Sequence, residues 1–212
     1  MFRFEKVSLE QFIQDCTGFC TNEYALEQAY NQIKLPEAKT PGSAGFDFYA
    51  PFHIDIYSDS KVRIPTGIRW ICKDEDLVRY ETRDGVYHGT HFGFYLQLVP
   101  RSSLGCKYRL QLSNTMGIID ADYWKSDNDG HILVDIYRPP MLEVVKSWYT
   151  NDENGILTMV SFPKRGHDAF DNEVLTIEAG SAFVQGIIQP YVKLPEYTRK
   201  EVRNGGFGST DE

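Results

Sequence analysis

The stretch HFGFYLQLVPRSSLG, residues 91–105, decides the fold. Its apolar residues Phe92, Phe94, Leu96 and Leu98 alternate with other residues, which is the period-two pattern of a half-buried β-strand. Pro100 then ends the strand, because proline cannot donate to a sheet ladder. Similar runs lie on either side, namely GFDFYAPFHIDIY (45–57), KVRIPTGIRWIC (61–72), HILVDIYRP (131–139), ILTMVSFP (156–163), VLTIEAG (174–180) and AFVQGIIQPYV (182–192).

Many short strands separated by turn residues predict an all-β chain of the sandwich or jelly-roll kind. The exception is SLEQFIQD (8–15), where Ser8 and Gln11 form a capping box that predicts a short N-terminal helix. Two polar, turn-rich stretches, KDEDLVRYETRDGVYHG (73–89) and SWYTNDENG (147–155), are expected to be loops.

The charge, the apolar stretches and the cysteine content of the chain disfavour several classes of protein. The 212 residues carry 22 Lys and Arg against 30 Asp and Glu, a net charge of −8. Duplex nucleic acid is therefore not expected as a partner, since that binding needs a concentrated basic face. The N-terminal sequence has no apolar core of a signal peptide, and no stretch approaches a membrane-spanning length, so an intracellular protein is expected. The four cysteines are too few for a disulfide framework and lack zinc spacing.

Four further stretches hold residues suited to chemistry. They are TPGSAGFDFYAP (40–51) with Asp47, LSNTMGIIDADY (112–123), GSAFVQ (180–185) with Gln185, and the tail RNGGFGSTDE (203–212). Taken singly, each has an ordinary structural interpretation as a turn, a strand end or a loose chain end. The glycines of the tail would also let consecutive backbone amides surround a phosphate.

Together and in this order, these stretches and PRSSL resemble the five motifs of the trimeric dUTPase family, which cleaves dUTP to dUMP and pyrophosphate. The motifs reach from Gly42 to Thr210, and NTMGIIDADY and GGFGST are the most specific. The resemblance implies a jelly-roll-like dUTPase fold, with a short N-terminal helix and an inserted hairpin or loop.

The resemblance also implies a mechanism. Asp120 matches the aspartate that activates the attacking water, and Gln185 the residue that contacts the phosphates or that water. Attack on a triphosphate calls for Mg²⁺ across the phosphate oxygens, with Asp47 approaching the metal through water. Phosphate contacts are assigned to Arg101, Ser102 and Ser103.

Base selection is assigned to a tight hairpin from Asn114 through Gly117, whose backbone pairs with the uracil edge, with Ile119 nearby. Tyr123 matches the residue that packs on the deoxyribose and leaves no space for a 2′-hydroxyl. In the tail, Phe207 stacks on the base, and the phosphates are contacted by Arg203, Gly208, Ser209 and Thr210. In the family, the tail of one subunit closes a site built by others, so a homotrimer is implied.

Two positions depart from the family pattern. Ala182 stands where the fourth motif usually has arginine, and Arg203 lies one residue nearer to the glycines than usual. We expect a helical N-terminal extension over residues 1–33, a β domain over 34–200 with an insert at about 139–171, and a flexible tail over 201–212 that closes the active site.

Other functions remain open. A dCTP deaminase shares the fold and an Arg-Ser-Ser motif. A regulatory or nucleotide-sensing protein of this fold, encoded by a virus or phage, would use the insert at 139–171 to bind a macromolecule. A P-loop enzyme is disfavoured, because GGFGST lacks the lysine and the following helix.

Overall fold

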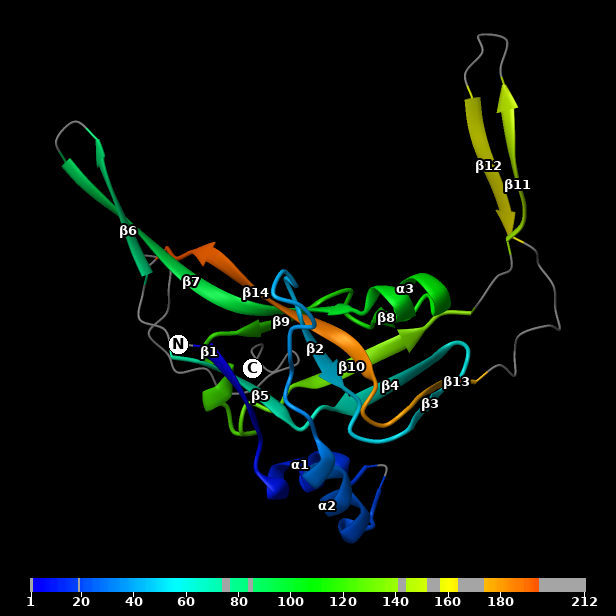
Figure 1. Cartoon of the computed structure of the whole chain (residues 1–212), viewed down its shortest axis with the longest axis horizontal. Helices are drawn as coiled ribbons and strands as arrows, with labels where there is room; N and C mark the ends of the chain where they lie inside the picture. The colour runs from blue at the N-terminus through cyan, green and yellow to red at the C-terminus, as the bar shows by residue number, and fades with distance from the viewer. Residues whose placement is uncertain are drawn as a thin grey trace, which may run out of the picture.

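The computed structural model describes residues 2–18, 20–73, 77–83, 86–140, 144–151, 157–163 and 174–194. Within them the chain is mostly strand, with the all-β, jelly-roll-like architecture predicted (Figure 1). The strands are β1 (Phe2–Lys6), β2 (Phe46–Tyr49), β3 (Ile54–Ile56), β4 (Ser60–Pro65), β5 (Ile68–Cys72), β6 (Leu77–Arg83), β7 (Val86–Pro100), β8 (Gln111–Leu112), β9 (Gly117–Asp120), β10 (Leu133–Arg138), β11 (Val144–Asn151), β12 (Leu157–Pro163), β13 (Leu175–Ile177) and β14 (Ala182–Val192). The helices are α1 (Leu9–Cys16), α2 (Glu23–Gln32), α3 (Ser102–Tyr108) and the short 3₁₀ turn η1 (Tyr123–Lys125).

The long strand β7 organises the largest sheet. Its neighbours follow the order β2, β14, β7 and β6, and β9 also pairs with β7. A second sheet has the order β4, β10 and β8, and all these pairings are antiparallel. Apolar residues of both sheets form one buried cluster, including Phe48, Leu96 and Phe183 from the first sheet and Ile64 and Ile136 from the second. The functional side chains described below lie at the edges of this core.

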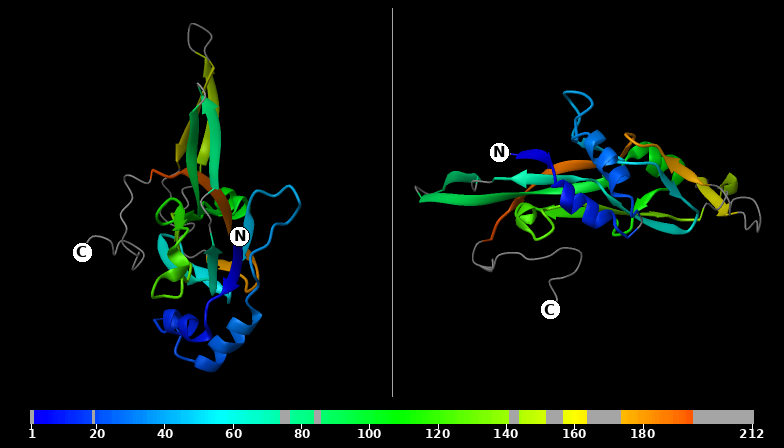
Figure 2. Two further views of the ribbon diagram at one scale, coloured as in Figure 1. Left: turned by 90° about the vertical axis from the view of Figure 1, so that its left-hand side faces the viewer. Right: turned by 90° about the horizontal axis from the view of Figure 1, so that it is seen from below.

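The predicted helix over SLEQFIQD is α1, and Ser8 accepts a hydrogen bond from the Gln11 backbone N–H as a cap. Before it, β1 pairs antiparallel with β5, and after it α2 begins at the capping residue Asn22. The two helices lie side by side at one end of the molecule (Figures 1 and 2). The first 33 residues therefore contribute to the main core, through Val7, Phe12, Cys16, Leu26 and Ile33.

Both stretches expected to be loops contain strand instead. Leu77–Arg83 is β6 and pairs with the start of β7, and Ser147–Asn151 belongs to β11. Polar, turn-rich composition was misleading here, because the hydrogen bonds between strands are made by the backbone and do not require apolar side chains. The strands β11 and β12 form the inserted hairpin that was predicted, a two-stranded sheet of their own that projects from the body (Figures 1 and 2).

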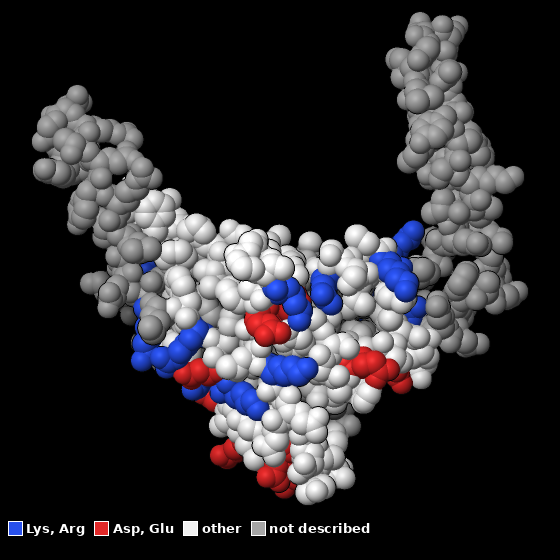
Figure 3. Space-filling model, in the orientation of Figure 1, with Lys and Arg blue, Asp and Glu red and all other residues white. Residues whose placement is uncertain are grey.

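The described part of the chain contains no helix long and apolar enough to span a membrane. The four cysteines are all unbridged. On the face drawn in Figure 3, lysine and arginine side chains are dispersed among uncharged and acidic ones rather than gathered in one stripe.

Candidate functional site

Three of the predicted residues meet at one edge of the large sheet. Asp47 on β2 is 1% exposed, and its Oδ1 accepts a hydrogen bond of 3.0 Å from Nε2 of Gln185. Its Oδ2 lies 3.6 Å from Nη2 of Arg101, an ion-pair distance that is too long for a hydrogen bond. Among the residues that the structure describes, this buried Oδ2 has no hydrogen-bond partner.

Strand register explains why these residues meet. β14 lies between β2 and β7, and Gln185 is opposite Asp47 on one side and Val99 on the other. Arg101 follows Val99 and Pro100 at the end of β7, so its guanidinium reaches the same edge. A buried carboxylate requires a compensating positive or donor group, and Arg101 and Gln185 supply both. Motifs far apart in sequence thus form one cluster, which we call the Asp47 cluster (Asp47, Arg101 and Gln185).

Two exposed hydroxyls stand beside this cluster. Ser102 and Ser103 begin α3 directly after Arg101, which is its N-cap residue and makes no side-chain cap. The predicted phosphate contacts are therefore neighbours on the surface.

A pocket of about 280 Å³ lies between β8, β9, β10 and η1, and we call it the nucleoside pocket. Its volume is near the lower end of the roughly 300 to 1,000 Å³ usual for small-molecule sites. Four predicted substrate residues line it: Asn114, Gly117, Ile119 and Tyr123. The remaining lining residues are Leu98, Leu112, Ser113, Ile118, Leu133, Val134 and Asp135.

The turn from Asn114 to Gly117 is tight, as predicted, but it is not the bend of a simple hairpin. β8 pairs with β10 in one sheet, whereas β9 pairs with β7 in the other, so the turn carries the chain between sheets. Thr115 adopts φ 71°, which is an energetically costly backbone conformation for a β-branched residue. Strained backbone conformations of this kind are concentrated at functional sites.

Gly117 allows the close approach of β9 to β7. A Cβ at this position would lie 3.0 Å from Cβ of Leu98 and 3.2 Å from its Cδ1, and Leu98 is itself buried. Any side chain here would push β9 outward and open the pocket.

Tyr123 is 5% exposed and forms one wall of the pocket. Its hydroxyl donates to the carbonyl oxygen of His131 at 3.2 Å and accepts from Nδ2 of Asn128 at 2.8 Å. Burial raises the pKa of the Tyr123 hydroxyl above its ordinary value, so the ring is neutral and fixed in place.

Asp120 lies elsewhere. It is half-buried at the end of β9, where it pairs with Tyr95 of β7. Arg101 of the Asp47 cluster lies six residues farther along the chain than Tyr95, which is a distance of about 20 Å at roughly 3.3 Å per strand residue. One chain therefore does not bring Asp120 to the Asp47 cluster. The predicted tail contacts Arg203, Phe207, Gly208, Ser209 and Thr210 lie outside the described residues.

The described residues could bind a metal ion through few protein ligands only. They include no group of three or more His, Cys, Asp and Glu side chains suited to hold an ion. The unbonded Oδ2 of Asp47 is an oxygen ligand of the type that Mg²⁺ prefers, but Arg101 lies beside it. A single carboxylate is consistent with a metal whose other ligands are phosphate oxygens and water.

Sequence reasoning missed one residue that lines the pocket and two that hold its Tyr123 wall. Asp135 on β10 faces the pocket with its carboxylate held by Arg63 through bonds of 2.7 and 2.8 Å. His131 and Asn128 were missed because they act on Tyr123 from a loop without a motif. The alternation of HILVDIYRP was the one available signal, since it sets Asp135 on a strand.

Comparison with known proteins gives a consistent result. No protein-family model matches the chain. The deoxyuridine 5′-triphosphate nucleotidohydrolase of Lactococcus lactis is 28% identical over 182 residues, covering 84% of this chain and 88% of that protein. The protein of the same name from Aeromonas salmonicida is 26% identical over 186 residues, with the same coverage.

The fold also has a solved counterpart. A dUTPase of Staphylococcus bacteriophage 80alpha, determined with dUPNHPP, has a TM-score of 0.52 and 15% identity, over 99% of this chain and 98% of that one. At that identity the match shows the shared fold alone. The ordered motifs, the relatives that span most of the chain and the common fold all show that this protein is similar to dUTPases.

Proposed function

We propose that this chain hydrolyses dUTP to dUMP and pyrophosphate, which keeps uracil out of DNA and supplies dUMP inside the cell. One observation carries the proposal: Asn114, Gly117, Ile119 and Tyr123, predicted from the motifs, line one pocket. The named relatives support the same activity.

Base selection follows from the shape of the turn. Backbone groups of residues 114–117 would pair with the uracil edge, and cytosine would leave buried donors and acceptors unpaired. Thymine would be excluded by its methyl group, because Gly117 packs directly on Leu98 and the pocket has no slack there. The Tyr123 ring would lie against the deoxyribose.

In the chemical step, Asp120 would orient and deprotonate the water that attacks the α-phosphorus. Arg101, Ser102, Ser103 and Gln185 would hold the phosphate oxygens and offset the charge that gathers on them. Mg²⁺, when bound with the substrate, would neutralise part of the triphosphate charge, with Asp47 as its protein contact.

A homotrimer completes this site. Because Asp120 and the Asp47 cluster lie apart along β7, an oligomer in which a second copy supplies the missing group is the simplest way to assemble them. The tail would close over the nucleotide, with Phe207 on the base and Arg203, Gly208, Ser209 and Thr210 at the phosphates.

The test is pyrophosphate release with Mg²⁺ from dUTP, dCTP, dTTP and UTP in parallel. We expect release from dUTP alone, and Asp120→Asn should lower kcat by about 10² to 10⁴-fold with nearly unchanged nucleotide binding. The matched control is Asp122→Asn, which removes an exposed carboxylate two residues away. No release from dUTP, or full activity of Asp120→Asn, would contradict the proposal, and ammonia release from dCTP would indicate the deaminase.

A second function is favoured by the hairpin of β11 and β12, which projects from the body as a separate sheet (Figure 2). Such a surface suits a regulatory protein that binds a macromolecule in response to nucleotide. The dUTPase of Staphylococcus bacteriophage 80alpha is described as one of the phage dUTPases that control transfer of virulence genes. If this chain is a regulator alone, dUTP will bind tightly without turnover, and Asp120→Asn will leave partner binding intact.

A further inference from the structure

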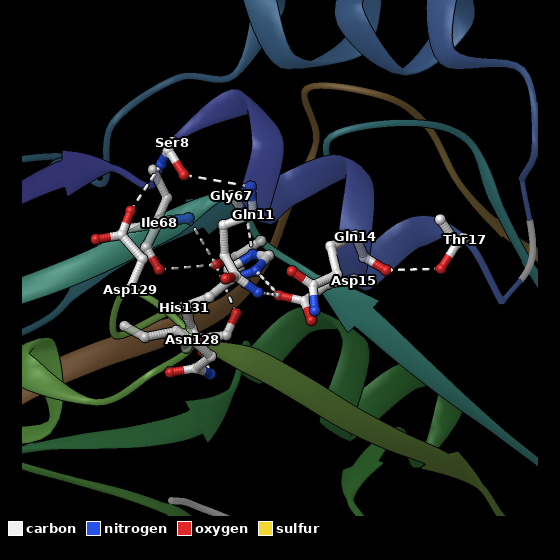
Figure 4. Close-up of polar contacts among 12 residues, drawn as sticks. Ser8, Gln11, Gln14, Asp15, Thr17, Gly67, Ile68, Asn128, Asp129 and His131 are labelled. Atoms are coloured by element: carbon white, nitrogen blue, oxygen red, sulfur yellow. Dashed lines mark hydrogen bonds and ion pairs between the residues drawn. The ribbon is translucent and has the colours of Figure 1, made fainter. Parts of the chain in front are cut away.

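The loop that follows Tyr123 is tied to the N-terminal helix through a buried histidine. His131 is completely buried, and its Nε2 accepts a hydrogen bond of 2.7 Å from the backbone N–H of Gly67. Because that N–H can only donate, Nε2 must carry a lone pair and the ring proton must be on Nδ1. Nδ1 therefore donates to Oδ2 of Asp15 on α1, at 2.5 Å (Figure 4).

The same loop has a second connection to the N-terminal segment. Oδ2 of Asp129 accepts a hydrogen bond of 2.8 Å from the backbone N–H of Ser8, and its other oxygen pairs with Arg69 of β5 (Figure 4 shows the Ser8 contact). Asp129 and Gly130 both have positive φ, at 58° and 69°. The loop is thus held in a conformation that few sequences adopt unaided.

This loop in turn fixes the wall of the nucleoside pocket. The carbonyl oxygen of His131 accepts from the Tyr123 hydroxyl, and Nδ2 of Asn128 donates to the same hydroxyl. A continuous path of hydrogen bonds and covalent bonds runs from Asp15 through His131 to Tyr123. If Asp15 loses its acceptor, the buried Nδ1–H of His131 is left unpaired, and the least costly relief is a shift of the loop.

We infer that Asp15 and His131 are positioning residues for Tyr123 and thereby set the selectivity of the pocket for deoxyribose over ribose. This inference rests on the proposed function. The Tyr123 ring excludes a 2′-hydroxyl only while it is held against the sugar, and a displacement of about 1 Å at such a contact costs up to about 100-fold.

The test compares kcat/KM for dUTP and for UTP in the full-length protein. Asp15→Ala should lower the dUTP to UTP ratio about tenfold or more, mainly through KM for dUTP and improved use of UTP. Asp15→Asn keeps an oxygen acceptor for Nδ1–H and should restore most of the ratio. Ile56→Val, in the buried core of β3, serves as the control for loss of stability and should leave the ratio unchanged.

Two measurements keep the inference falsifiable. If Asp15→Ala does not fold, Asn128→Ala removes the Nδ2 donor to the Tyr123 hydroxyl from a half-buried position and should lower the ratio in the same direction. In the pair Asp15→Ala and Tyr123→Phe, the double variant should be no less selective than Tyr123→Phe alone, because both changes act on one contact. A ratio within twofold of wild type in Asp15→Ala, or additive effects in the double variant, would overturn the inference.

Failure of the proposed function has a different signature. In that case wild type releases no pyrophosphate from dUTP. The affinities for dUMP and UMP, measured by isothermal titration calorimetry, then report the sugar selectivity of the pocket without turnover. Preference of wild type for dUMP that is lost in Asp15→Ala supports the positioning role without turnover. Equal binding of dUMP and UMP by wild type contradicts it.

Discussion

At the scale of single residues, Gly130 and Gly180 form a natural comparison. Both adopt left-handed φ, at 69° and 75°, where a Cβ costs about 1 to 2 kcal/mol. A Cβ on Gly180 would be 3.6 Å from the flexible Lys34 Nζ, whereas a Cβ on Gly130 would be 2.4 Å from Cα of Trp124. Of these two glycines, only Gly130 has both a left-handed φ and a neighbouring backbone atom that leaves no room for a Cβ.

We predict that Gly180→Ala lowers the free energy of unfolding by about 1 to 2 kcal/mol and Gly130→Ala by about 3 kcal/mol or more. Urea unfolding at neutral pH measures both. Gly42→Ala, which has open space around the added Cβ, is the control for the substitution itself. Equal losses at Gly130 and Gly180 would show that the Trp124 backbone yields.

Residue patterns predicted one part of the site and not another. Asp47, Arg101 and Gln185 stand in ordered motifs, and they do meet in one cluster. The Asp15 to His131 hydrogen bond joins residues 116 positions apart, and neither residue belongs to a motif. A lone aspartate on a helix and a lone histidine before a strand carry no local signal, because their pairing is a property of the fold.

At the scale of elements, strands with alternating apolar residues were predicted well, and strands in polar stretches of sequence were not. β10 buries every second residue, and the buried Leu96 and Leu98 of β7 are also two positions apart, so burial produces the alternating pattern in these sequences. In β14 the neighbours Phe183 and Val184 are both buried, at a shift in strand register. β6 and much of β11 lie in stretches of polar residues. α2 lies within the extension that was expected to be helical, but its bounds were not predicted, since it buries only Leu26.

The hairpin of β11 and β12 is predicted to be dispensable for stability. Within the described ranges these strands form hydrogen-bond ladders only with each other, so removing them should break no ladder of the larger sheets. Replacing residues 141–171 by a short Gly-Ser linker should change the unfolding temperature by less than about 3 °C, equivalent to about 1 kcal/mol for a chain of this size. Turnover of dUTP should also be kept.

Differential scanning calorimetry and the pyrophosphate assay test that variant. A linker of scrambled composition and equal length controls for loop closure, whose cost changes slowly with length. A fall of more than about 8 °C would mean that the hairpin packs on the body.

At the scale of the whole molecule, the N-terminal segment is joined to the sheets by ionisable groups. Burial alone would raise the pKa of the Asp15 carboxyl, but hydrogen bonds from His131 and Gln11 outweigh it and hold the pKa below 3.8. Burial also opposes ionisation of Glu5, and hydrogen bonds from Arg69 and Arg3 again outweigh it, so its pKa lies below 4.5. Each carboxylate is thus favoured in the folded state.

These lowered pKa values determine whether the folded state gains or loses stability as the pH falls. A carboxyl with a lowered folded pKa contributes stability above its unfolded pKa, and that stability is lost as pH falls through the folded value. We therefore predict that stability falls below about pH 4.5, and that Asp15→Asn flattens this fall. Thermal unfolding between pH 7 and pH 3 measures it. Gln14→Ala, an exposed change on α1 that removes no ionisable group, is the control and should leave the slope unchanged.

The anchoring of the N-terminal segment has a consequence for synthesis. Residues 2–16 leave the ribosome before the groups that hold them, which are Gly67, Arg69, Asp129 and His131. At about 5 to 20 residues per second, the 116 positions between Asp15 and His131 represent on the order of 6 to 23 s of translation. During that interval an isolated eight-residue α1 is too short to persist as a helix, and Phe12 and Cys16 have no core to enter. This segment thus reaches its native position only after residue 131 has emerged, and the nascent chain must keep the apolar side chains of the segment from aggregating until then.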